Sequence, residues 1–120
     1  MNNLSALTQN ITEVLSHLLE CEKSTVEAQE NEQSWEILLK QKKNALIIEH
    51  YSDKDKLKEF GPNDVIRDAR LAELLAPLAE STQEARRQRI ISERNQRTAA
   101  LLYQHQRDLL RIAELTATYK

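Results

Sequence analysis

His17 and Cys21 are the residues whose types and spacing come closest to a reactive or metal-binding pair in this sequence. Because they stand four residues apart, they share one face of a helix. A thiol beside an imidazole can ligate a metal or act as an activated nucleophile. However, Cys21 also falls in a regular series of apolar residues, where a small thiol packs well. We therefore interpret the pair as part of a helix interface, and we expect no catalytic residue, no metal site and no cofactor.

A cluster of basic residues is the second candidate for chemistry: Arg86, Arg87, Arg89, Arg94 and Arg97. Such a cluster can bind phosphate groups or an acidic partner. The formal net charge of the chain is −2, which disfavours general attraction to nucleic acid. Glu93 also stands four residues before Arg97, where it can form an ion pair within one helix. We favour a solvated helix face over a nucleic-acid or acidic-partner adaptor, which stays an alternative.

The composition predicts an all-α protein. The 120 residues include one glycine and two prolines, 4% are aromatic and 30% are charged. Sheet proteins need more turn residues and favour aromatic and β-branched side chains. A single glycine also excludes a P-loop and a dinucleotide-binding fingerprint. We therefore do not expect an enzyme.

No targeting or membrane segment is visible. The first residues, Met1–Asn3, carry no basic region followed by an apolar one. The longest apolar run, Ala45–Ile48, is far too short to cross a bilayer. The expectation is a cytoplasmic protein without stable membrane insertion, and one lone cysteine suits a reducing compartment.

The first half carries a heptad-like register. Apolar or small residues alternate at steps of three and four: Leu4, Leu7, Ile11, Val14, Leu18, Cys21, Thr25 and Ala28. The series lapses at Glu32 and resumes at Trp35, Leu39 and Leu46. This spacing is typical of a helix with one face against a partner helix. Either one helix or a helix pair is expected over residues 1–60. A break, if there is one, is expected near Asn31–Ser34 or near Tyr51–Asp53, and the polar stretch Glu27–Gln33 is the preferred place.

Residues 61–64 form the one clear turn. Gly61 can end a helix in the left-handed conformation, Pro62 cannot continue it, and Asn63 or Asp64 can cap the next helix. Residues 65–120 are expected to be helical, with a kink near Pro77 and a fresh helix start at the capping box Ser81–Glu84. The sequence thus predicts a single helical domain over 1–120. Its fold is an antiparallel bundle of about three to four long helices, a hairpin with its central turn at Gly61-Pro62.

The last helix carries more apolar surface than one neighbour needs. A stripe around Leu102, with Ile91, Thr98, Leu109 and Ala113, is expected to pack on the first half, and one stripe of about 100° suffices for that. A second stripe lies about 100° away on the helix: Ile90, Leu101, Ile112, Leu115 and Tyr119. A third flank holds Ala99, Tyr103 and Leu110. The surplus predicts a bundle core, a second copy of the chain, or a groove for another protein's amphipathic helix.

The segment Glu93–Gln106 resembles part of the long C-terminal helix of the FlgN-like flagellar export chaperones. The likeness rests on Asn95 followed by polar residues and the Leu101-Leu102 step. Glu13–Lys23 is similar to the family's first helix and Ser34–Lys42 to its second. Thr98 and Ala99 stand where the family often has Asn followed by Gly.

The resemblance implies a cytosolic chaperone of type III secretion in flagellum biogenesis. Its partners would be flagellar hook-associated proteins of the hook–filament junction, whose C-terminal helices it would bind, and the export gate or ATPase. It would prevent premature assembly of these clients and deliver them for protein export. Ile90, Leu101, Ile112, Leu115 and Tyr119 are the expected client-binding residues, with Asn95, Thr98 and Leu102 as a possible motif. The alternative is a self-associating structural coiled coil or adaptor, a homodimer without an export client.

Overall fold

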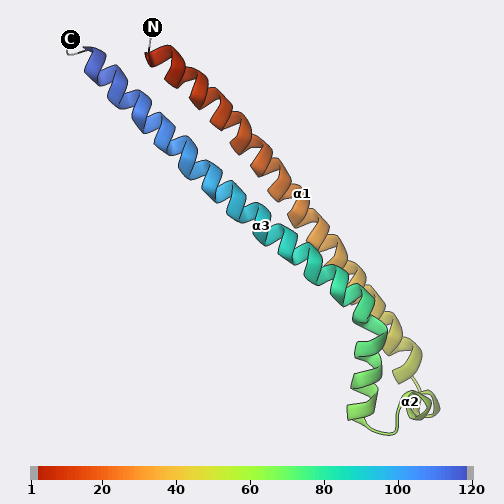
Figure 1. Ribbon diagram of the computed structural model, residues 1–120. Helices are drawn as coiled ribbons and strands as arrows, with labels where there is room; N and C mark the ends of the chain where they lie inside the picture. The colour runs from red at the N-terminus through yellow and green to blue at the C-terminus, as the bar shows by residue number, and fades with distance from the viewer. Residues whose placement is uncertain (1–2, 119–120) are drawn as a thin grey trace. The chain divides into compact units, whose positions relative to one another are not determined.

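The computed structural model describes residues 3–118, and these form three helices and no strand (Figure 1). The helices are α1 (Asn3–Tyr51), α2 (Lys54–Phe60) and α3 (Asp64–Thr118), so the all-α prediction is confirmed. The chain divides into two compact units. We call residues 1–28 with 89–120 the terminal unit, and residues 29–88 the turn unit. Among the described residues, no helix contains an apolar stretch long enough to cross a membrane.

The N-terminal helix does not break where its sequence is most polar. α1 continues through Glu27–Gln33, so the preferred position of a break is wrong and the alternative near Tyr51–Asp53 is confirmed. Glu and Gln are good helix formers, and polarity alone does not end a helix. The interruption lies after Tyr51 instead, where Asp53 takes an extended backbone and its side chain accepts a hydrogen bond from the Asp55 amide at 2.7 Å. Asp53 is thus the N-cap that starts α2.

The central turn lies at Gly61-Pro62, as the sequence predicts. The amide of Gly61 donates to the carbonyl of Leu57 at 3.1 Å and closes the last turn of α2. Gly61 has φ 175°, an extended backbone, so the expected left-handed conformation is wrong. Asn63 caps α3, because its Oδ1 accepts a hydrogen bond from the Ile66 amide at 3.0 Å.

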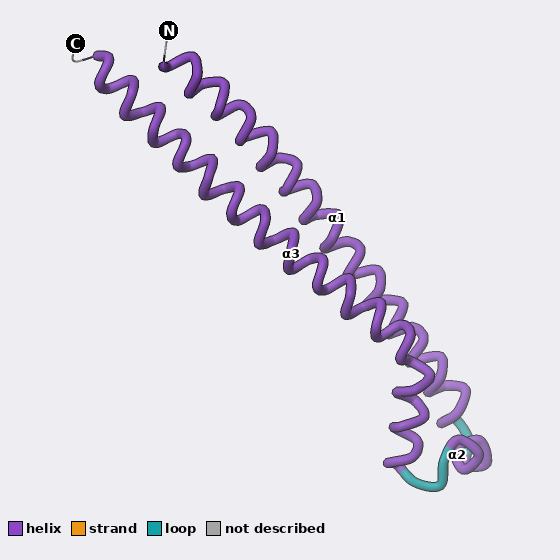
Figure 2. Tube along the Cα trace, viewed as in Figure 1, coloured by secondary structure: helices purple, strands orange, loops and turns teal. Residues whose placement is uncertain are grey.

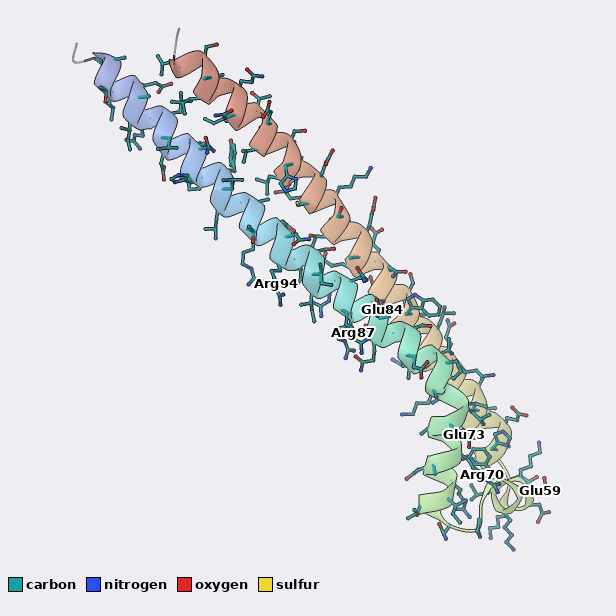
Figure 3. The ribbon with its side chains drawn as sticks, viewed as in Figure 1. Glu59, Arg70, Glu73, Glu84, Arg87 and Arg94 are labelled. Carbon is teal, nitrogen blue, oxygen red and sulfur yellow. The ribbon has the colours of Figure 1, made fainter. Side chains whose placement is uncertain are left out.

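α3 runs without interruption from Asp64 to Thr118 and contains Pro77. The fresh start expected at Ser81–Glu84 is therefore wrong. Thr82 is buried and donates to the carbonyl of Leu78 at 2.8 Å, a bond inside a continuing helix. The ribbon of α3 bends between the labelled residues Glu73 and Glu84 (Figure 3). A proline lacks the amide hydrogen and crowds the preceding turn, so it bends a helix whose packing holds it together.

In the turn unit, α1 and α3 pack against each other through one seam. Leu46, Leu75 and Ala85 are buried there. Glu32, where the apolar register lapses, is also in the seam and only 7% exposed. Its Oε1 lies 3.4 Å from Nε of Arg86 across the hairpin. The residue at the lapse is therefore a buried carboxylate paired with a cation. A buried charge needs such a partner, because an unpaired one is strongly destabilising.

α2 is attached by an aromatic side chain and by one arginine of α3. The buried ring of Phe60 stacks on His50 with ring centroids 4.3 Å apart, and Tyr51 lies 5.8 Å from it. Arg70 donates from α3 to the carbonyls of Glu59 and Phe60; Figure 3 labels Glu59 and Arg70 at this end of the turn unit. These bonds satisfy carbonyls that a helix end leaves without partners.

Candidate functional site

The terminal unit is a pair of antiparallel helical segments with a thin core. Residues 3–28 of α1 run beside residues 89–118 of α3 (Figure 2). Of the residues described in this unit, three are buried: Leu18, Thr25 and Ala99. The hydroxyl of Thr25 donates to the carbonyl of Ser92 at 3.1 Å. Small side chains at this contact allow a side chain of one helix to reach the backbone of the other.

The face of α3 that packs on α1 differs from the predicted one. Ala99 is only 2% exposed, and Tyr103 and Leu110 on the same flank are half-buried. The stripe around Leu102, predicted to face α1, is largely exposed: Ile91, Thr98, Leu102 and Leu109 are exposed, and Ala113 alone is half-buried. The flank with Ala99, Tyr103 and Leu110 therefore packs on α1, and the Leu102 stripe lies beside this contact and is largely exposed.

The predicted client-binding stripe is open to solvent. Ile90 is 42% exposed, Leu101 70%, Ile112 61% and Leu115 52%. Tyr119, the fifth member, lies outside the described residues. We call Ile90, Leu101, Ile112 and Leu115 the outer stripe. Because the Leu102 stripe beside it is exposed as well, the exposed apolar surface of α3 is wider than predicted.

Charged side chains interrupt the outer stripe. On a helical wheel of 100° per residue, Arg94, Arg97 and Asp108 fall within about 40° of Leu101. Figure 3 shows Arg94 on the side of α3 away from α1. Within residues 3–118, Arg94 and Arg97 have no ion pair, whereas Asp108 accepts a hydrogen bond from Gln104 at 3.0 Å. The outer stripe therefore presents apolar contact together with charges of both signs.

Glu93 does not support Arg97 as predicted. Its carboxylate lies 3.0 Å from Nη1 of Arg89, four residues earlier in the helix. Arg89 is thus part of an internal pair, as a solvated helix face predicts, but Arg97 keeps its charge on the outer stripe.

A hollow of about 370 Å³ lies between the two helices of the terminal unit. His17 and Cys21 line it from α1, and Asn95, Thr98, Ala99 and Leu102 line it from α3. The structure thus brings together the thiol–imidazole pair and the three residues of the possible motif. Sγ of Cys21 lies 3.6 Å from Nε2 of His17. No group of three His, Cys, Asp or Glu side chains suited to a metal occurs among residues 3–118.

The two arginines of the cluster that belong to the turn unit are engaged with acids. Arg86 pairs with Glu32, and its Nη2 lies 3.6 Å from Oε1 of Glu36. Arg87 lies 3.2 Å from Glu84. Hydrogen bonds from the Gln88 amide and from Arg87 hold the pKa of the Glu84 carboxyl below its usual 4.5. Glu84 is fully exposed, so this is a surface ion pair and not a buried functional group.

Comparison of the chain with protein-family models, curated proteins and solved structures found no match. What the structure defines is a class: an all-helical hairpin whose terminal unit leaves a broad apolar face of α3 uncovered. Large uncovered apolar patches mark interaction sites in soluble proteins.

Proposed function

We propose that the outer stripe binds an amphipathic helix of another protein, and that the chain is a cytoplasmic export chaperone of the FlgN-like kind. Its clients are the C-terminal helices of flagellar hook-associated proteins of the hook–filament junction. Covering these helices prevents premature assembly until the client reaches the gate or ATPase of the type III export apparatus.

The observation that carries this proposal is the exposure of four large aliphatic side chains on one helix face. These four positions are 11, 11 and 3 residues apart, a spacing that keeps them on one face of α3 where another helix can pack. Covering about 300 Å² of apolar surface on each partner contributes about 15 kcal/mol in all at ~25 cal/mol per Å², and association costs of at least ~4 kcal/mol reduce this to the range of reversible binding. Binding of that strength is reversible, as a chaperone that releases its client requires. The choice of flagellar clients rests on the sequence resemblance in Glu93–Gln106.

A titration with a client helix tests the proposal. A fluorescein-labelled peptide covering the C-terminal helical region of a hook–filament junction protein is titrated with the chain, and anisotropy is recorded. We expect saturable binding with a Kd of about 1–10 μM, which corresponds to about 7–8 kcal/mol. A peptide of identical composition with its apolar residues scrambled, so that no helical stripe forms, is the matched control and should not bind. Equal binding of both peptides, or none at ~100 μM, would contradict the proposal.

A further inference from the structure

Two pairs of positions on the outer face of α3 match in kind at equal distances before and after Leu101, whereas the mirror positions of Arg97 and Leu115 are His105 and Arg87. Ile90 lies 11 residues before Leu101 and Ile112 lies 11 after it. Arg94 lies seven residues before and Asp108 seven after. An apolar residue is therefore matched with an apolar one, and a cation with an anion, at equal distances from the centre.

From this pattern we infer that a second copy of the chain packs on the outer stripe, with α3 antiparallel to α3 of the partner and Leu101 at the two-fold axis. In such a pair, residues at equal distances before and after the centre lie at the same height, because each residue rises 1.5 Å. Ile90 then meets Ile112 of the partner subunit, and Arg94 meets Asp108 of the partner subunit. A two-fold axis makes each of these contacts twice.

The charges favour this arrangement over its alternatives. A parallel two-fold pair would place Arg94 against its own copy and Asp108 against its own copy, and like charges in contact repel. In the antiparallel pair, both arginines at position 94 find a carboxylate. Asp108 is exposed, and its hydrogen bond comes from the neutral Gln104 side chain. Its negative charge is therefore available for a second partner.

The exposed area is also sufficient for a dimer. The chain exposes 9102 Å², whereas a typical folded monomer of 13.9 kDa exposes about 6,700 Å². The excess of about 2,400 Å² exceeds the ~800 Å² that each partner contributes to a standard interface.

The dimer and a client helix would compete for the same face, a consequence that rests on the proposed function. The dimer would then be the resting form, and client binding would convert it to a one-to-one complex. The dimer itself does not depend on the existence of a client.

Charge exchange tests the dimer on the protein alone. Arg94→Glu and Asp108→Arg each place like charges together twice in the interface, so each should weaken dimerisation about tenfold or more in sedimentation velocity. The double variant Arg94→Glu/Asp108→Arg restores opposite charges and should restore the dimer. Glu114→Arg, an equal reversal of charge on α3 away from the outer stripe, should leave dimerisation unchanged. Circular dichroism at 222 nm checks that each variant is folded.

A cross-link provides a second measurement that does not disturb the charges. In a Cys21→Ser background, Leu101→Cys places two thiols at the two-fold axis, and mild oxidation should give a covalent dimer; Glu114→Cys should not. A wild-type chain that is monomeric at ~100 μM, or a dimer unaffected by either single charge reversal, would overturn the inference. The peptide titration with the wild-type chain, run below the concentration at which it dimerises, separates the two ideas. Retained binding leaves the proposed function standing whether or not the dimer forms.

Discussion

Replacing Leu101 and Ile112 together with Gln is expected to weaken binding of the client helix at least about a hundredfold and to leave the free protein folded. Both side chains are mostly exposed in the free chain, so most of their apolar area becomes buried only when a partner helix covers it. Full burial of a Leu or Ile side chain is worth about 1.5–3 kcal/mol. Losing two of them removes about 3 kcal/mol or more of binding free energy. Gln has nearly the helix propensity of Leu, so the free energy of unfolding should fall by less than about 1.5 kcal/mol.

The matched control for this double variant is Leu19→Gln/Val26→Gln. Both of these side chains belong to the terminal unit and are about half exposed, but they lie on α1. The control should bind the client peptide like the wild type in the anisotropy titration. If the control lost binding and the α3 variant kept it, the binding surface would have to be assigned to α1. A large fall in the melting temperature of the α3 variant would place Leu101 and Ile112 in the folded core.

Phe60→Ala is expected to destabilise the protein by about 3 kcal/mol, at the lower end of the range for removing a buried phenylalanine. The ring is 7% exposed and stacks on His50. It is the buried side chain of α2, so its removal leaves that short helix attached mainly by Arg70, which donates to the carbonyls of Glu59 and Phe60. A helix of seven residues has little stability of its own. Urea unfolding followed by Trp35 fluorescence measures the loss, because Trp35 is half-buried in the turn unit.

Phe60→Leu is the matched control, since it keeps an apolar side chain of similar volume. It should lower the free energy of unfolding by less than about 1.5 kcal/mol. A loss below about 1 kcal/mol for Phe60→Ala would mean that the aromatic stack contributes little to holding α2.

Sequence periodicity alone predicted the packing face of α1. Three members of the predicted series on α1 are buried: Leu18, Thr25 and Leu46. Glu32 interrupts the series of apolar residues but keeps its spacing of three and four residues. Glu32 keeps its place in the seam because Arg86 of α3 supplies an opposite charge. A sequence shows the lapse, but the identity of the cross-hairpin partner requires the register of the two helices.

The orientation of α3 could not be predicted in the same way. This helix has three apolar flanks, and hydrophobicity alone does not rank them. The structure buries Ala99, at 2% exposure, and leaves Leu102 44% exposed, the reverse of the order that their hydrophobicity predicts. The outer stripe stays exposed in either orientation.

The residues around the hollow of the terminal unit were predicted individually, but their proximity was not. His17 and Cys21 were identified as a pair on α1, and Asn95, Thr98 and Leu102 as a possible motif on α3. The structure places all five around one hollow. These residues lie together because of the register in which α1 and α3 run antiparallel. That register depends on the exact bounds of α2, which the sequence alone does not give.

Methyl-resolved NMR tests the central claim most directly. The chain has eight isoleucines, and their δ1 methyl groups can be followed while the client helix is added. We predict that Ile90 and Ile112 shift on binding, and that Ile48 and Ile66, which are exposed in the turn unit, do not. Shifts confined to Ile48 and Ile66, with Ile90 and Ile112 unchanged at saturation, would contradict the assignment of helix binding to α3.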